Sequence, residues 1–163
     1  MSTTSVEALV QVEQWGDLLE SATHEVFGMM LGCDLEPTSP PETCVAEVTA
    51  VVGVAGPLSG AVTVRCSRNA AERMAAAMLG IPVTEVNQQH WDAVGEICNM
   101  VAGSFKAKLA DIGDRCMLSV PTVVNGSDYT VRSLVNGNTI HRAFKFGGDV
   151  ISESVEMYVR SEA

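Results

Sequence analysis

A carboxylate and an amide three residues apart, Glu96 and Asn99, are the residues whose types and spacing suggest chemistry. They fall in a segment with the 3.6-residue periodicity of an amphipathic helix, so the two side chains lie next to each other on one face. An asparagine in mid-helix costs about 0.5–1 kcal/mol relative to alanine. Two interpretations are open: an ordinary solvated face that tolerates a weak helix former, or a flat surface that contacts a partner.

The pair belongs to a polar stripe along this predicted helix. At about 100° per residue, the stripe lies within about 40° of one direction. Its members are Asp92, Glu96, Asn99, Gly103 and Lys106. An apolar stripe lies opposite and faces the core: Val94, Cys98, Val101, Phe105, Leu109 and Ile112. The pattern predicts one long helix from about residue 86 to residue 112, closed by Gly113, on which Gly103 leaves a bare patch of backbone.

Motifs of several common enzyme classes are missing from the sequence. The glycine-rich stretch 53–60 contains Pro57 and leads into a strand, so it predicts a hairpin turn rather than a phosphate-binding loop. The five cysteines include no C-x-x-C and the three histidines have no helical ligand partner, so we expect neither a disulfide framework nor a metal site. There is no G-x-S-x-G, P-loop or H-E-x-x-H, although a nucleophile triad from distant residues stays open.

The other periodicities predict an α+β fold, an antiparallel sheet with helices packed on it. Further helices are expected at 6–31 and 69–79, the second capped by Ser67. Residues 34–43 are expected to form a loop. Strands are expected at 44–55, 61–66, 116–120, 129–135, 139–146 and 150–159.

Turn signals and the last strand complete this prediction. Asn136-Gly137 and Gly147-Gly148 predict hairpin turns on either side of the 139–146 strand. Four residues near the C-terminus could form an edge of the sheet or simply core: Val155, Met157, Tyr158 and Val159.

Composition and charge narrow the range of partners. The chain has 163 residues, of which 47% are hydrophobic and 18% charged, as expected for a single domain over residues 1–163. The net charge is −10, with nine acids and no lysine or arginine in residues 1–64, which disfavours nucleic acids and anionic membranes as partners. Without a membrane-length apolar run or a basic leader, a cytoplasmic protein is expected.

The segment around Glu96 resembles the signature helix of the CheC/CheX/FliY family of chemotaxis phosphatases. In that family a Glu-x-x-Asn pair followed by a small residue marks the active site, and residues 93–103 read AVGEICNMVAG. Residues 121–126, PTVVNG, are similar to the P-T-V-V-x-G segment of CheX. The resemblance covers nearly the whole chain and implies the CheC-like fold, an antiparallel sheet with two long helices packed on it plus a shorter helix.

The resemblance implies a protein phosphatase that hydrolyses the phospho-aspartate of a CheY-type receiver domain. Asn99 would orient the attacking water, and Glu96 would reach the active-site lysine of the receiver. Gly103 would let the receiver approach, while Asp92 and Lys106 either border the docking surface or are merely solvated. This chain would bind no cofactor, because the Mg²⁺ belongs to the receiver.

The resemblance also implies one active site per chain and a homodimer. CheC-type members carry two active-site helices, but here Glu25 is followed at the paired position by Gly28 instead of asparagine, which resembles CheX. CheX proteins typically pair edge to edge through their sheets. The alternative is a non-catalytic interaction module, as in the middle domains of flagellar switch proteins. The Glu96–Asn99 pair discriminates between the two, since a pure scaffold has no reason to keep it.

Overall fold

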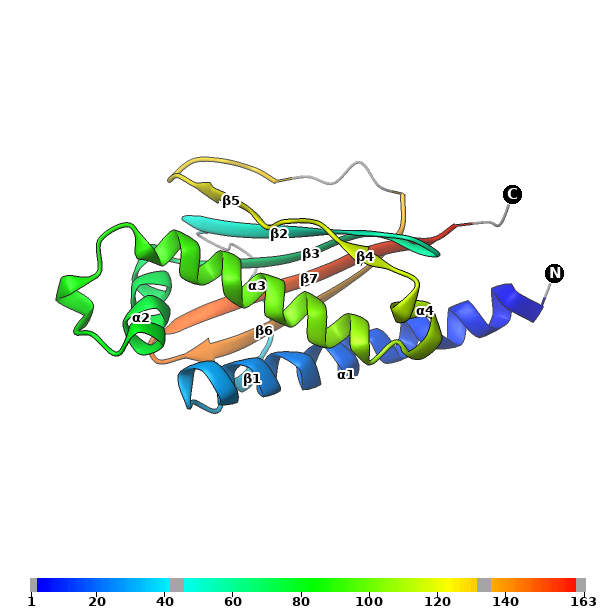
Figure 1. The fold of residues 1–163 in the computed structure, drawn as a ribbon, viewed down its shortest axis with the longest axis horizontal. Coiled ribbons are helices and arrows are strands. Elements are labelled where there is room, and N and C mark those ends of the chain that lie inside the picture. The colour runs from blue at the N-terminus through cyan, green and yellow to red at the C-terminus, as the bar shows by residue number, and fades with distance from the viewer. Residues whose placement is uncertain (1–2, 42–45, 132–135, 161–163) are drawn as a thin grey trace.

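The chain forms one antiparallel sheet with its helices on a single face (Figure 1). The computed structural model describes residues 3–41, 46–131 and 136–160. The helical elements are α1 (Thr3–Leu31), α2 (Arg68–Leu79), the 3₁₀ turn η1 (Val83–Glu85), α3 (Gln89–Ala107) and α4 (Ala110–Asp114). The strands are β1 (Glu36–Thr38), β2 (Val48–Ala55), β3 (Leu58–Cys66), β4 (Met117–Leu118), β5 (Thr122–Asn125), β6 (Asn138–Phe146) and β7 (Asp149–Val159).

The sheet runs in the order β1-β6-β7-β3-β2-β4, and β5 also pairs with β2. Every pairing is antiparallel, so the predicted α+β class with two long helices and a shorter one is confirmed. β7 lies between β6 and β3, and its C-terminal residues therefore form no sheet edge. Val155 and Met157 belong to the core, whereas Tyr158 and Val159 are exposed.

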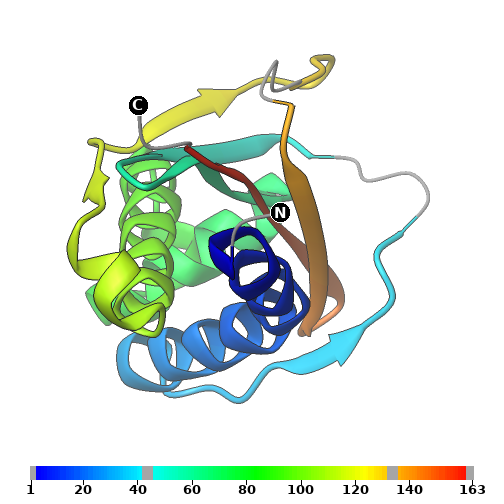
Figure 2. The ribbon, with the colours of Figure 1, turned by 90° about the vertical axis from the view of Figure 1, so that its right-hand side faces the viewer.

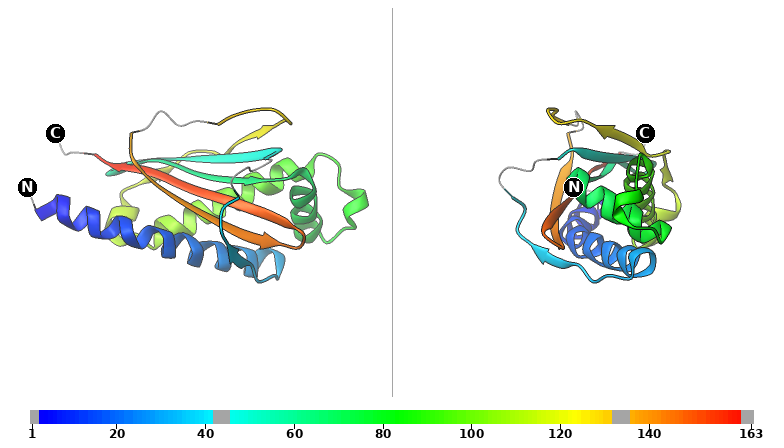
Figure 3. Two further views of the ribbon diagram at one scale, coloured as in Figure 1. Left: turned by 180° about the vertical axis from the view of Figure 1, so that it is seen from behind. Right: turned by 90° about the vertical axis from the view of Figure 1, so that its left-hand side faces the viewer.

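The sheet curves around α1 and α3 from one side, as the end-on views show (Figures 2 and 3). Side chains along β7 alternate between the two faces, as in any strand. Ile151 and Val155 are fully buried beneath the helices, while Ser152 and Ser154 lie on the opposite face and are half-buried. Within the described ranges no helix covers that second face, which is referred to below as the open face.

The short helix α2 has the ends that its sequence predicts. The Ser67 hydroxyl accepts a hydrogen bond from the Ala70 backbone N–H at 3.1 Å, and so satisfies one free donor of the first turn. Gly80 ends the helix in the left-handed conformation at φ 66°.

The predicted long helix over 86–112 is wrong at both ends. α3 spans only Gln89–Ala107, and a separate short helix, α4, begins at Ala110, which has a left-handed backbone at φ 52°. The chain folds back so tightly here that a Cβ on Gly113 would meet the Lys106 carbonyl oxygen. No glycine or proline marks the break between residues 106 and 112, because tertiary packing causes it.

One loop prediction and one strand prediction also differ from the structure. The predicted loop 34–43 contains β1, which pairs with β6 and tolerates Pro37 because it is the edge strand. Residues 129–131 form no strand, and 132–135 lie outside the described residues. The predicted Asn136-Gly137 hairpin turn depends on residues 132–135, which lie outside the described residues. The Gly147-Gly148 turn between β6 and β7 is confirmed.

Candidate functional site

α3 presents the predicted polar stripe on the side away from the core. Its inward side is buried without gaps, with Val94, Cys98, Val101 and Phe105 at most 1% exposed. Glu96 is exposed and Asn99 is half-buried, as the periodicity predicts. Throughout the part of the chain that the structure describes, neither side chain has a hydrogen bond or ion pair. A carboxylate and an amide, both available to a partner, therefore lie one helical turn apart.

Cys98 fixes the rotation of α3 directly beneath this pair. Its thiol lies 3.5 Å from both the Ala50 carbonyl of β2 and the Val62 carbonyl of β3. Burial, with the Glu153 carboxylate as a smaller cause, raises the pKa of the Cys98 thiol to about 12. The thiol therefore stays neutral and acts as a small anchoring side chain rather than a nucleophile.

The segment β4–β5 lies alongside the N-terminal half of α3. Gly95 permits this approach, because a Cβ at this position would be 3.1 Å from Val123 Cγ2. The Asn125 side-chain amide forms two hydrogen bonds in the orientation that gives both its oxygen and its nitrogen a partner. Its oxygen accepts a hydrogen bond from Trp91 Nε1 at 3.2 Å, and its nitrogen donates one to the Glu47 carbonyl at 3.3 Å. Trp91, Asp92, Val123 and Asn125 line an open hollow of about 440 Å³. Asp92 therefore borders a recess beside the stripe, a feature that the sequence pattern did not predict.

The C-terminal half of the stripe is open. A Cβ on Gly103 would meet no described atom within 4 Å beyond its own helix, so packing within the chain does not require glycine here. Lys106 is half-buried, and its ammonium has no ion pair among the described residues. The five predicted stripe residues thus share one face of α3, with Gly103 as its unobstructed part.

The N-terminal helix holds a second glutamate that is not free. Glu25 of α1 accepts hydrogen bonds from Lys108 Nζ at 2.7 Å and from Ser104 Oγ at 2.9 Å. These bonds, Lys108 first and Ser104 second, hold the pKa of Glu25 below its usual value. Gly28, one turn further, has open space around it. Sequence reasoning did not identify Ser104 and Lys108, although their i, i+4 spacing places them on one helical face.

The described residues contain neither a metal-binding cluster nor a membrane-spanning helix. Among these, no three histidine, cysteine, aspartate or glutamate side chains come together as a metal site. No described helix combines the length and the apolar character that a membrane span needs.

Solved structures with the same architecture define the class of this protein. The chemotaxis protein CheX of Vibrio vulnificus is 25% identical, with a TM-score of 0.78 over 89% of this chain and 97% of that chain. A CheX-CheY-BeF3-Mg complex from Borrelia burgdorferi contains a chain that is 18% identical, with a TM-score of 0.70 over 86% of this chain and 96% of that chain. The fold is therefore that of the CheC-like chemotaxis proteins.

Sequence comparison identifies the family within this class. The model of the family described as chemotaxis phosphatase CheX matches residues 48–145, which run from the start of β2 into β6 and include the whole of α3. The CheY-P phosphatase CheX of Thermotoga maritima is 27% identical over 120 residues, covering 71% of this chain and 77% of that protein. The chain belongs to the chemotaxis phosphatase CheX family, as the resemblance in the sequence implies.

Proposed function

We propose that this chain hydrolyses the phospho-aspartate of a CheY-type receiver with Glu96 and Asn99 of α3. The observation that carries the proposal is the free carboxylate–amide pair, which sits on a helix held by a buried thiol and by a flanking strand. A pair without partners among the described residues is available to another protein. The relative from Thermotoga maritima carries the name CheY-P phosphatase, which supports the same substrate.

In the proposed reaction, the main contribution of this chain is to position the attacking water and to hold α3 against the receiver. In a receiver domain, a bound Mg²⁺ and a lysine stabilise the charge of the acyl phosphate. The water oxygen attacks phosphorus, the bond from phosphorus to the aspartyl oxygen breaks, and the products are inorganic phosphate and the free carboxylate. The Asn99 amide can both accept from and donate to groups around the attacking water and so holds it in line. Glu96 pairs with the receiver lysine and fixes α3 against the site.

The docking surface in this proposal extends from Asp92 to Lys106. Asp92 and Lys106 lie at the two ends of the stripe, and Gly103 lets the receiver backbone come close to α3. The chain holds no cofactor of its own in this reaction. The Mg²⁺ comes with the receiver, as the composition of the Borrelia burgdorferi complex supports.

We also propose one active site per chain. The carboxylate of Glu25 is engaged by Lys108 and Ser104, and Gly28 offers no amide where a second pair would need one. A receiver therefore finds one free pair on each copy. We further propose that residues 1–163 form a single domain, that the protein is cytoplasmic, and that two copies pair through sheet edges.

Replacement of Asn99 by alanine tests the proposal. Wild-type protein should accelerate the loss of radiolabelled phosphate from a phosphorylated CheY-type receiver, and Asn99→Ala should abolish that acceleration. Because Asn99 has no partner in the described part of the chain, the melting temperature should stay the same or rise slightly.

The matched control is Asn87→Ala, which removes an exposed asparagine just before α3 and should leave the rate unchanged. A melting temperature that falls by many degrees in Asn99→Ala would show a structural role and overturn the assignment. Failure of the wild type on every receiver of the same genome would favour the non-catalytic interaction module.

A further inference from the structure

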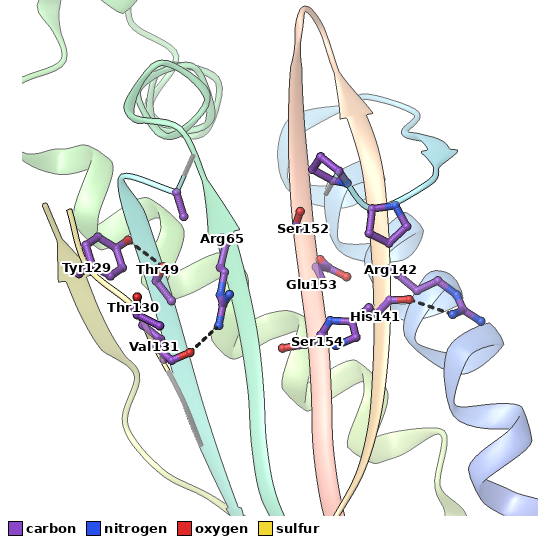
Figure 4. Close-up of a pocket in the computed structure, with 13 residues that line it drawn as sticks. Thr49, Arg65, Tyr129, Thr130, Val131, His141, Arg142, Ser152, Glu153 and Ser154 are labelled. Carbon is purple, nitrogen blue, oxygen red and sulfur yellow. Dashed lines mark hydrogen bonds between the residues drawn. The ribbon is translucent and has the colours of Figure 1, made fainter. Parts of the chain in front are cut away.

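We propose that the open face of the sheet carries a second site, which binds a small organic oxyanion at Arg65. A cavity of about 380 Å³ lies on this face, as Figure 4 shows. It is formed by strands β2, β3, β7 and β6 together with the segments at 40–41 and 129–131. Its volume falls in the range of small-molecule pockets. α3 lies on the other face of the sheet, so this cavity is separate from the proposed receiver surface.

Arg65 supplies an unmatched positive charge to this cavity. The residue pairs across the sheet with Thr49 of β2 and Ser152 of β7, which places it near the middle of the open face. Its Nη2 donates one long hydrogen bond, 3.4 Å, to the Val131 carbonyl. Its Nε is buried and has no hydrogen-bond partner among the described residues. A buried guanidinium donor without an acceptor is costly, and an oxyanion would satisfy it.

No carboxylate among the described residues neutralises Arg65. Glu153 lies on the same stretch of β7, but its carboxyl group contacts Thr23 of α1 on the helix side of the sheet. Arg142 also borders the cavity, and it forms an ion pair with Glu20 of α1 at 2.9 Å. The two neighbouring charges are therefore turned toward α1, and among the described residues the cavity keeps the net positive character of Arg65.

Further donors surround the guanidinium on the same face. Ser154 of β7 pairs with His141 of β6 and lies diagonally from Arg65 in the strand register. Neither the Ser154 hydroxyl nor the His141 ring has a hydrogen bond within the described structure. On the other side, the Tyr129 and Thr49 hydroxyls lie 2.8 Å apart, and one of their two protons remains free for a ligand.

The residues that line the cavity indicate which chemical group the oxyanion is attached to. Pro40, Pro41 and the Tyr129 ring supply apolar surface next to the charged centre. A bare inorganic ion would leave this surface uncovered, whereas an organic anion with an aromatic or aliphatic body would cover it. The geometry therefore fits a phosphate ester or a carboxylate that carries an apolar group.

Calorimetric titration at low ionic strength tests the site, with phenyl phosphate and benzoate as the probes and no receiver present. Wild-type protein should bind at least one of them saturably, with one ligand per chain. Arg65→Gln should weaken binding about tenfold or more. Arg115→Gln, which removes an exposed arginine outside the cavity, should bind like the wild type. Tighter binding of phenyl phosphate identifies a phosphate ester as the ligand class, and tighter binding of benzoate identifies a carboxylate.

The melting temperature of Arg65→Gln shows whether this variant is folded. If it is not, a second variant still tests the site. His141→Gln alters an exposed residue of the same cavity and should also weaken binding while the fold is retained. The proposal fails if the wild type binds neither probe saturably, or if folded Arg65→Gln and His141→Gln bind as tightly as the wild type.

Discussion

At the scale of single residues, Glu153 is the most unusual group in the protein. It is 2% exposed, and burial raises its pKa to about 8, although a hydrogen bond from Thr23 acts in the opposite direction. The Thr23 hydroxyl lies 2.8 Å from the Leu19 carbonyl and 2.6 Å from Glu153 Oε2. A hydroxyl has one proton, and a carbonyl can only accept. If Thr23 donates to Leu19, the proton between Thr23 and Glu153 comes from a neutral Glu153.

The buried Glu153 predicts a stability that falls as pH rises. The folded state holds the proton up to about pH 8, whereas the ordinary value is 4.5, so the folded state binds more protons between these limits. The contribution of Glu153 to the free energy of unfolding is therefore fully present below pH 4.5 and is lost progressively up to about pH 8. Urea titrations across this range should show the decline in the wild type and a flatter profile in Glu153→Gln.

The control for this experiment is Glu156→Gln, on the same strand but on the open face. It should keep the pH dependence of the wild type. Parallel profiles for the wild type and Glu153→Gln would mean that Glu153 is ionised in the folded state.

Whether a residue's role could be predicted from the sequence depends on how far along the chain its neighbours in the fold lie. Glu96 and Asn99 were predictable because their placement depends only on the period of their own helix. Arg65, Glu25 and Glu153 were not, because the groups that decide their environment lie 66, 83 and 130 residues away in the chain.

At the scale of elements, α3 contains two glycines with opposite surroundings. Gly95 faces Val123 of β5 closely, whereas Gly103 faces open space in the described structure. The first is required by packing within the chain. No described residue explains Gly103, which fits the proposed approach of a receiver.

Leucine at each glycine separates these two roles. Gly95→Leu should overpack the contact with β5 and lower the free energy of unfolding by about 1–3 kcal/mol. Gly103→Leu should leave stability unchanged or raise it by about 0.5–1 kcal/mol, since leucine favours a helix over glycine. Gly103→Leu should nevertheless slow the dephosphorylation of a receiver, measured beside thermal melting. Full activity in Gly103→Leu would remove Gly103 from the docking surface.

The sequence predicted elements whose ends are fixed by adjacent residues. It missed elements whose ends depend on packing or strand pairing with distant parts of the chain. Ser67 and Gly80 bound α2 as expected, because capping is a property of adjacent residues. The end of α3 at Ala107 depends on the packing of Gly113 against Lys106. β1 and β5 exist because β6 and β2 offer them free edges, which no short stretch of sequence reveals.

At the scale of the whole molecule, the described sheet ends in two different edges. One is β1, three residues long and containing Pro37, and the other is formed by β4 and β5 next to β2. Pro37 offers no backbone N–H for pairing, and short edge strands with proline resist association. The β4–β5 edge has no proline within its strands and is the better candidate for pairing with a second copy.

The proposed homodimer predicts a solution mass of twice the 17.3 kDa chain. Light scattering at micromolar concentration should give this value for the wild type. Val123→Pro should shift the mass toward a single chain, because the register of β5 on β2 turns the Val123 N–H away from β2, toward the free edge. Glu36→Pro, in the opposite edge strand β1, provides the comparison. A wild-type mass equal to one chain would exclude the dimer under these conditions.

The contact of Glu25 with Ser104 and Lys108 has a consequence for stoichiometry. The Glu25 carboxylate of α1 is bonded to Ser104 of α3 and to Lys108 directly after it, so α1 braces the helix that carries Glu96 and Asn99. In the proposed reaction α1 therefore supports the active site on α3 and does not form a second one. If each copy offers a single free pair, the capacity of a cell to clear phosphorylated receivers scales with the number of chains, one receiver for each. The lifetime of the phosphorylated receiver would then depend on how many copies of this chain the cell makes, because one chain could not bind two receivers at once.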